Sequence, residues 1–271
     1  MTGTDARALL QAGRLAEAVT AQQAAVKAQP LDAGGRYLLC GLLCFSGEWD
    51  RAARQFDFLA HQDKELTTPA AVYGGLLAAE RHRAAAFAGG ETPLLSPDAP
   101  AHARERQAAL AAWRGGDPVE AGRRLEAAVA AQPSLAGRLD GREFTALRDL
   151  DDLLGSVLEV FAGGRYLWLP LEQVRRLTIA EPVHLLDLLW LPATLEGIDG
   201  GTAAVHLPVL YAGSAGAADD QLRLGRQTDW RDEGPFYRGL GQRLLASVDR
   251  DGDEREAGLL AVRSLEFDPA A

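Results

Sequence analysis

The sequence predicts a multi-domain chain. A tetratricopeptide-like domain of α-helical repeats is expected over residues 1–137, and an α+β domain with a small, mainly antiparallel sheet or barrel over residues 138–271. Two observations predict this division. One segment is written twice, and the alanine-rich texture of the first half gives way near residues 135–141 to short apolar runs separated by turns. A change from a helical to a mixed pattern favours separate domains, and a chain of 271 residues can bury two cores.

The repeated segment begins at a glycine and ends at a proline. It reads GRLAEAVTAQQAAVKAQP from Gly13 and GDPVEAGRRLEAAVAAQP from Gly116, and a looser copy begins at Gly47, 34 residues after the first. Alanines stand at matching positions, and small residues let two helices approach closely. A period of 34 residues is that of tetratricopeptide units, which cover their apolar faces by stacking. The alternative is ordinary amphipathic helices in an alanine-rich protein.

Helical spacing of apolar residues sets the expected elements of this first domain. A helix is expected within each copy and another before it. Residues 67–90 have helical spacing without the repeat's glycine or proline, so we expect an irregular pair of helices there, followed by a proline-rich loop over 89–101. The preceding helices are expected over 4–11, 33–45 and 101–114.

Turn residues divide the second domain into short elements. Residues 149–161 are expected to form a helix, 171–180 fit either a helix or a strand, and 182–197 combine a helical turn with an extended run that stops at Pro192. An Asp-Gly turn is expected between the last two strands. Strands are expected over 165–170, 202–207, 221–225, 241–247 and 258–267.

Composition argues against several classes of partner. The formal net charge of −10 has the wrong sign for a protein that binds nucleic acid or anionic lipid through basic residues. No uncharged apolar run approaches the roughly 18 residues that span a bilayer, and the first residues do not read as a signal peptide. Cys40 and Cys44 are too few for a disulfide scaffold. We expect a cytoplasmic protein with no nucleic-acid or membrane partner.

Three motifs resemble known sites but miss a required residue. The acidic run Asp249, Asp251, Asp253 and Glu256 has its glycine at the fourth position, where a calcium-binding EF-hand needs one at the sixth. The stretch YAGSAG around Ser214 lacks the first glycine of a nucleophile elbow, and RGLGQR lacks the third glycine of a dinucleotide loop. We expect no metal and no cofactor.

The pair His184 and Asp187 supports the enzymatic alternative. Their helical spacing would let a histidine base be oriented by a carboxylate, as a hydrolase requires. A structural histidine beside an apolar face explains the same residues. The hydrolase hypothesis requires both side chains to share one concave pocket.

Six ordered segments carry a resemblance to a known family. The sequence resembles the ImpE family, also called TagJ, which are accessory proteins of type VI secretion, over nearly the whole chain. The segments are AERHRAAAFAGG, GGRYLWLP, HLLDLLWLPATL, LPVLYAGS, LRLGRQTDW and GLGQRLL.

The resemblance implies a cytoplasmic, non-enzymatic protein without catalytic residues. It implies an adaptor that binds the N-terminal helix of the small subunit of the contractile sheath and links it to the ClpV-type AAA+ ATPase that disassembles contracted sheath. A regulatory scaffold for a kinase or chaperone, with no role in secretion, is a third hypothesis beside the adaptor and the hydrolase.

Five residues are candidates for contact with a partner helix. Helical repeats present grooves that receive a partner's helix. The repeat pattern places Tyr37, Gly41 and Cys44 on the inner helix of the second unit, and Arg106 and Trp113 on that of the third. The alternative is that Cys44 and Trp113 only pack between helices.

Overall fold

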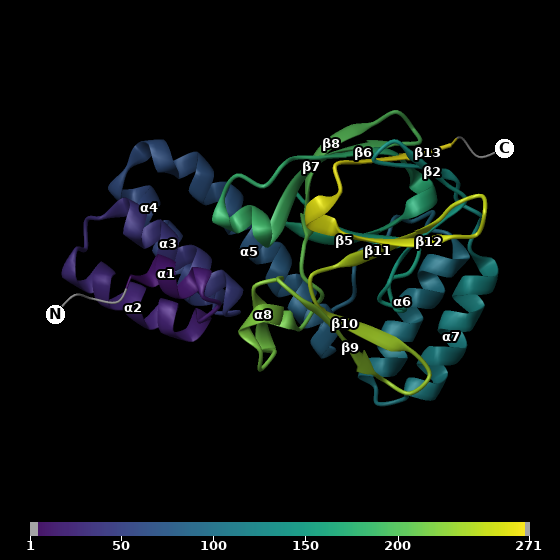
Figure 1. The fold of residues 1–271 in the computed structure, drawn as a ribbon, viewed down its shortest axis with the longest axis horizontal. Helices are drawn as coiled ribbons and strands as arrows, with labels where there is room; N and C mark the ends of the chain where they lie inside the picture. Colours follow the sequence, from purple (N-terminus) through teal and green to yellow (C-terminus); the bar gives the residue numbers. More distant parts are fainter. Residues whose placement is uncertain (1–4, 269–271) are drawn as a thin grey trace.

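The computed structural model describes residues 5–268, and of Leu66 it describes only the backbone. A helical region precedes a region rich in β-strands (Figure 1). The helices begin or end within a residue or two of the predicted bounds, and Thr4, the first residue of the first expected helix, lies outside the described residues. The helices are α1 Ala6–Gln11, α2 Leu15–Ala28, α3 Ala33–Phe45, α4 Trp49–Gln62, α5 Thr67–Ala88, α6 Ala101–Arg114 and α7 Pro118–Ala131, with a 3₁₀ turn at Lys64–Leu66 before α5.

The repeated glycines occupy the same place in three helix-helix turns. Gly13, Gly47 and Gly116 have φ angles of +75°, +71° and +83°, a left-handed conformation that residues with a side chain rarely adopt. Ala18 and Ala52, at equivalent positions in the copies, are completely buried. The turns and the close helix contacts that the repeated segment predicts are therefore present.

Residues 67–90 differ from the prediction, because Thr67–Ala88 form one continuous helix of 22 residues, α5, and not an irregular pair. No proline lies inside it after the first turn, and Gly74 and Gly75 remain helical. Helices α1 to α5 pack each on the next, whereas α6 and α7 form a separate hairpin beside the strands (Figure 1). Gly122 of α7 faces Pro235 of the strand region, where an added Cβ would lie 2.4 Å from the proline Cβ.

The strands confirm the predicted antiparallel pairing. Thirteen strands lie within residues 5–268, and every pair of neighbouring named strands is antiparallel. The main sheet has eight strands in the order β2-β1-β13-β6-β7-β8-β4-β5, beside a three-stranded sheet β12-β11-β3 and a hairpin of β9 and β10. The bounds are β1 Gly137–Leu139, β2 Arg142–Phe144, β3 Ala146–Asp149, β4 Val157–Ala162, β5 Arg165–Pro170, β6 Val174–Ile179, β7 Trp190–Gly197, β8 Thr202–Pro208, β9 Thr228–Asp232, β10 Tyr237–Gly241, β11 Leu244–Val248, β12 Glu254–Gly258 and β13 Ser264–Phe267.

The helix predicted over 149–161 is wrong. The segment is the end of β3, a tight turn, and the buried strand β4. The turn forms because Asp149 and Asp151 accept backbone N–H groups two residues ahead, from Asp151 and Leu153 at 2.8 and 3.0 Å. Such local bonds compete with a helix. The apolar run that looked helical is a strand buried along almost its whole length.

Three further expectations need correction. Residues 221–225 were expected to be a strand but lie in the short helix α8, Asp220–Arg223, which Asp219 caps. Strand β7 continues through Pro192, whose carbonyl accepts the Ala180 N–H. The proline is tolerated because β6 has ended at Ile179, so its missing N–H interrupts no ladder. The Asp-Gly turn joins β11 to β12. Of the last expected strand, 258–267, only the end is one, because the 3₁₀ turn Leu259–Ala261 separates β12 from β13.

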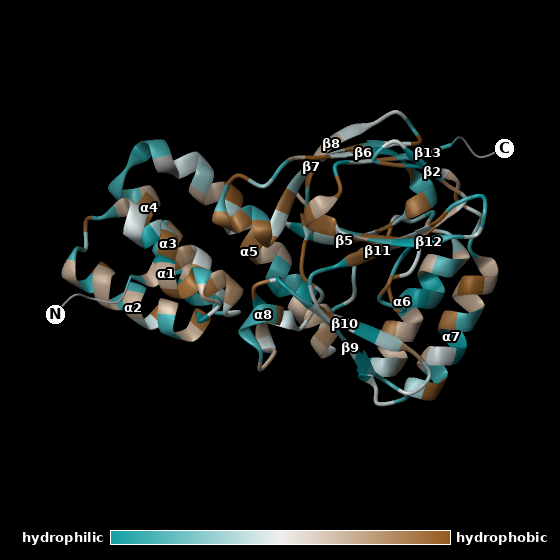
Figure 2. Ribbon diagram, in the orientation of Figure 1, coloured by the Kyte–Doolittle hydropathy of each residue, from teal (hydrophilic) through white to brown (hydrophobic). Residues whose placement is uncertain are grey.

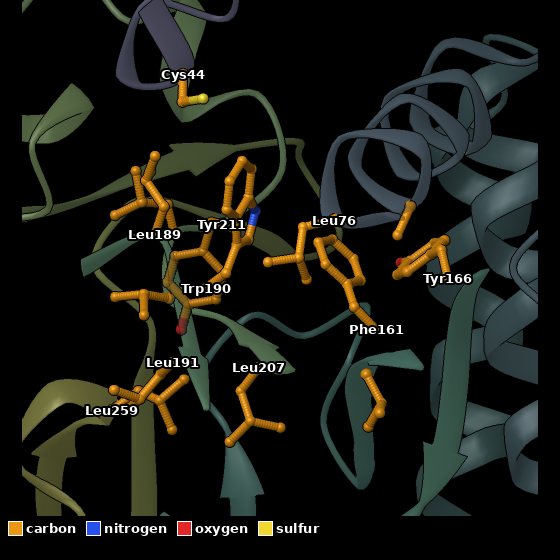
Figure 3. Close-up of a cluster of buried hydrophobic side chains, with 14 of the residues drawn as sticks. Cys44, Leu76, Phe161, Tyr166, Leu189, Trp190, Leu191, Leu207, Tyr211 and Leu259 are labelled. Carbon is orange, nitrogen blue, oxygen red and sulfur yellow. The ribbon is translucent and has the colours of Figure 1, made fainter. Parts of the chain in front are cut away.

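The buried apolar side chains form one cluster that includes residues of both regions. Figure 2 shows the β9–β10 hairpin mostly in teal and white, the colours of hydrophilic and intermediate residues. In the close-up of Figure 3, Cys44 of α3 lies near Leu189, Trp190 and Tyr211 of the strand region. The helices and the sheet therefore share a packed boundary.

Candidate partner-binding pocket

A cavity of about 350 Å³ opens where the helical region meets the strands. The α3–α4 turn, α5, the end of α6, the segment after β8 and the β9–β10 hairpin all contribute to its wall. We call it the junction pocket. Its aromatic residues are Phe45, Trp49, Phe87, Trp113, Trp190 and Tyr211, and its charged residues are Glu80, Arg83, Arg231 and Arg238.

A buried carboxylate under the pocket joins α5 to the strands. Glu159 of β4 accepts two bonds of 2.8 Å from Arg83, and further bonds from Arg243 and the Tyr166 hydroxyl. Burial by itself would raise the pKa of Glu159, but the two guanidinium groups outweigh it and lower the pKa to about 2. Arg83 also donates to the Leu210 carbonyl at 2.8 Å. The groups of this cluster thus satisfy one another.

A second buried carboxylate continues the cluster. Asp149 accepts bonds from Arg243 at 2.6 Å and from the Tyr211 hydroxyl at 2.9 Å. Burial raises the pKa of Asp149 to about 6, because one guanidinium does not offset the loss of water and because Asp151 lies close. Arg243 consequently holds Asp149 and Glu159 together from one side chain.

Arg238 is a buried charged residue of the pocket that has donors to spare. Its Nε lies 2.9 Å from Asp151, and its guanidinium carbon lies 4.7 Å from the centres of both the Phe87 and Trp113 rings. The residue is 4% exposed. Within residues 5–268, neither Nη1 nor Nη2 has a hydrogen-bond partner. The side chain is therefore fixed in place while its terminal nitrogens stay available.

Two of the five predicted contact residues line this pocket. Cys44 is 2% exposed and burial raises the pKa of its thiol well above the ordinary value, so it acts as a small apolar residue. Trp113 forms part of the wall and stacks on Arg238. The structure brings these two residues together from α3 and α6.

The other three predicted residues lie elsewhere. Tyr37 lines a separate apolar groove of about 260 Å³ between α3, α4 and α5, and its hydroxyl lies 2.7 Å from that of Tyr73. Gly41 is covered by Leu185, because an added Cβ would lie 2.7 Å from the leucine Cδ2. Arg106 is 2% exposed and donates to the Asp152 carbonyl at 2.7 Å. Burial lowers the pKa of Arg106 to about 10.

The pair His184 and Asp187 has a local structural role. The Asp187 carboxylate accepts the backbone N–H groups of Val183 and His184, both at 2.8 Å, and so caps the 3₁₀ turn Leu185–Leu188. His184 is exposed and neither residue lines the junction pocket. Ser214 is buried and its hydroxyl donates to the Tyr211 carbonyl and accepts the Gly241 N–H.

Sequence reasoning missed Glu80, Arg83 and Arg238, the charged residues that shape the pocket. A signal was present, since AERHRAAAFAGG contains Glu80 and Arg83, and RGLGQR begins at Arg238. The glycines of RGLGQR were tested against a phosphate loop, whereas its arginines carry the structural role. Gly239 lies so close to Tyr211 that an added Cβ would be 2.3 Å from the ring.

The described part of the chain holds neither a cluster of metal ligands nor a membrane-spanning helix. Among residues 5–268, no three His, Cys, Asp or Glu side chains gather as ligands for a metal ion. None of the helices in that range combines the length and apolar character needed to cross a membrane.

Comparison with known proteins gives consistent matches. Residues 141–266 match the family described as ImpE protein. The chain is 38% identical over 266 residues to the type VI secretion system accessory component TagJ of Pseudomonas aeruginosa, which is 97% of this chain and 91% of that protein. The crystal structure of VPA1032 from Vibrio parahaemolyticus has the same fold, with a TM-score of 0.87, 98% of each chain covered and 23% sequence identity.

Proposed function

Because the chain belongs to the ImpE/TagJ family of type VI secretion accessory proteins, we propose that it is a non-enzymatic adaptor of such a secretion system. We propose that it acts in the cytoplasm, binds the N-terminal helix of the small contractile-sheath subunit, and links the sheath to the ClpV-type AAA+ ATPase. The relative from Pseudomonas aeruginosa is named an accessory component, which supports the adaptor role.

The observation that carries this proposal is the junction pocket. Pockets that anchor partner side chains combine aromatic walls with a few polar groups. Part of the junction pocket comes from segments that also carry the family resemblance, including Phe87, Trp190 and Tyr211. We therefore propose that the partner helix places an anchor side chain there.

The proposed repeat character fits the same role. The glycine turns and buried alanines of α1 to α4 match two tetratricopeptide-like units, with α6 and α7 as a third, detached one. On this proposal the domain division falls at 137/138, and the junction pocket lies where the stack meets the strands.

The buried ionisable groups support a non-enzymatic role. Glu159, Asp149 and Arg243 bind one another, and Asp187 binds backbone. A general base needs a free lone pair within reach of a substrate. The carboxylate oxygens and guanidinium protons of these groups instead form hydrogen bonds inside the protein.

Isothermal titration calorimetry of the full chain with a peptide of the sheath subunit's N-terminal helix tests the proposal. We expect saturable binding of one peptide per chain. Trp113→Ala should weaken it about tenfold or more, because aromatic anchors in pockets carry much of an interface's free energy. Phe58→Ala is the matched control, since Phe58 is 43% exposed and lines neither cavity.

The absence of heat with correctly folded protein would contradict the proposed partner. Equal affinities of the Trp113→Ala and Phe58→Ala variants would contradict the proposed binding surface. Circular dichroism of both variants verifies that the fold is retained.

A further inference from the structure

We propose that the junction pocket binds a carboxylate carried on a bulky apolar group, as an acidic residue beside an aromatic or aliphatic one presents it in a protein partner. That a protein segment supplies this carboxylate rests on the proposed function. That the ligand is a carboxylate on an apolar group is argued from the pocket alone.

The free charge of the pocket is positive. Glu80 is the one carboxylate among the described residues that line it. Its two oxygens are occupied, because Oε1 accepts from Arg83 at 3.2 Å and Oε2 accepts from the Trp190 indole at 3.0 Å. Arg83 in turn is committed to Glu159. Arg231 and Arg238 are left to face the cavity.

Arg238 has the geometry of a carboxylate receptor. Its Nε is held by Asp151 and its plane lies against two aromatic rings, so the guanidinium loses little further freedom on binding. The terminal nitrogens Nη1 and Nη2 have no partner within the described residues, although the residue is 4% exposed. Neither nitrogen is among the fully buried atoms that lack a partner, so both are open to the solvent of the cavity, and two parallel N–H groups match the two oxygens of a carboxylate.

The register of the β9–β10 hairpin supplies a second argument. Arg231 stands directly opposite Arg238 in this antiparallel pair. Two like charges at opposite positions repel each other, since their Cβ atoms are only about 4.5–5.5 Å apart. Arg231 is exposed and has no salt bridge within residues 5–268. An anion between the two side chains would relieve this repulsion.

The size and the walls of the pocket determine what accompanies the anion. A volume of about 350 Å³ exceeds that of a carboxylate, and Trp49, Trp113 and Trp190 surround the remaining space. Because Asp151 already neutralises part of the charge of Arg238, a single negative charge suits the site better than a phosphate dianion. An apolar group that ends in one carboxylate satisfies both requirements.

Binding of 3-phenylpropionate to the full chain, compared with 3-phenylpropanamide, tests the chemistry. The readout is the ¹⁵N indole signals of the tryptophans, where Trp49, Trp113 and Trp190 should shift and Trp168, which does not line the pocket, should not. We expect a dissociation constant on the order of millimolar for a ligand of this size, with the amide at least about tenfold weaker.

Substitution of the arginines tests the assignment. Arg231→Gln should weaken 3-phenylpropionate binding about threefold, as loss of a partly exposed ion pair does. Arg165→Gln is the matched control, because Arg165 is an exposed strand arginine that does not line the pocket. Arg238→Gln should abolish the shifts. If that variant does not fold, Arg238→Gln combined with Asp151→Asn removes both charges of the buried pair.

Equal affinity for the acid and the amide, no shift with either ligand, or equal competition by inorganic phosphate would overturn the proposal. Displacement of 3-phenylpropionate by the sheath peptide supports a protein source, and binding of the peptide without displacement overturns that source. If the peptide does not bind while 3-phenylpropionate does, the proposed partner fails and the carboxylate chemistry stands.

Discussion

Asp149 and Glu159 are neighbours in one buried ion cluster, yet their pKa values move in opposite directions. Burial favours the neutral form of each carboxylate. Two guanidinium groups reverse this effect at Glu159, whose pKa falls to about 2. At Asp149 a single guanidinium, that of Arg243, and the hydrogen bonds from Tyr211 and the Asp151 N–H do not outweigh burial, and the pKa rises to about 6. The number of arginines within reach therefore decides which carboxylate holds its charge most firmly.

The raised pKa of Asp149 predicts that its contribution to stability grows as pH falls from 7 to 5. The unfolded chain has the ordinary value of 3.8, so the native state takes up a proton first. The resulting increase in the free energy of unfolding amounts to at most about 3 kcal/mol and is complete near pH 4. Glu159 acts oppositely, since the stability it provides above pH 4.5 is lost as pH falls towards 2.

Urea unfolding of the wild type and of Asp149→Asn, compared at pH 7 and pH 5, measures this contribution. We expect the free energy of unfolding of the wild type to rise relative to the variant between the two pH values. Burial also lowers the pKa of His206, so protonation of this histidine reduces the stability of the protein as pH falls. This contribution is the same in the wild type and the variant and therefore cancels in their difference. A constant difference between the two proteins would contradict the prediction.

At the scale of elements, α5 joins the helical stack to the strands. A Cβ added at its Gly75 would lie 3.6 Å from the Gly164 Cα. Its Arg83 forms an ion pair with Glu159 of β4. Gly74, one position earlier, has no neighbour within 4 Å of an added Cβ and is exposed. Adjacent glycines in one helix thus face different surroundings.

Gly74→Ala should stabilise the protein by about 0.5–1 kcal/mol, because alanine loses less backbone entropy in a helix. Gly41→Ala in α3 is the matched comparison. Its Cβ would lie 2.7 Å from Leu185, so the same gain in helix propensity is offset by displacement of that side chain. The midpoints of urea unfolding measure both effects, and equal midpoints for the two variants would refute the distinction.

Sequence patterns predicted the elements whose signals are local. The bounds of α3 and α6 followed from apolar spacing and flanking residues. The turn within 149–161 did not, because its buried aspartates bind backbone groups while the leucine spacing imitates a helix. Cys44 and Trp113 were predicted from the repeat, whereas Arg238 is fixed in the site by its bond to Asp151, 87 residues earlier in the chain. That bond and the packing of Gly41 on Leu185 depend on distant parts of the chain.

For the whole molecule, the helical stack is attached to the strand region at its first two helices as well as through α5. Asp220 accepts the Leu15 N–H at the start of α2 at 2.7 Å. Arg226 donates to the carbonyls of Leu10 and Gln11 at the end of α1, at 2.7 and 2.9 Å. These bonds satisfy helix-end groups that a lone hairpin would leave to water. The domain division at 137/138 stays a prediction.

Removal of these contacts by Asp220→Ala with Arg226→Gln should loosen α1 and α2 alone. Loss of three hydrogen bonds, each of about 0.5–1.5 kcal/mol, should raise amide hydrogen exchange in these helices at least about tenfold. Exchange in β6, β7 and β8 should not change. Arg7→Gln is the control, since Arg7 is exposed on α1 and away from these contacts. Uniformly faster exchange in both regions would contradict a local effect.

The length of α5 has a geometric consequence. Its 22 residues form a rod of about 33 Å, with one end in the helical stack and the other beside the strands. Glu80, Arg83 and Phe87 stand on successive turns near that second end and form part of the cavity wall. Any rotation of the stack about the strands must bend this rod or break its Arg83–Glu159 ion pair, and either change displaces those side chains. The shape of the cavity therefore follows the angle between the two halves, and a molecule lodged inside would hold that angle fixed.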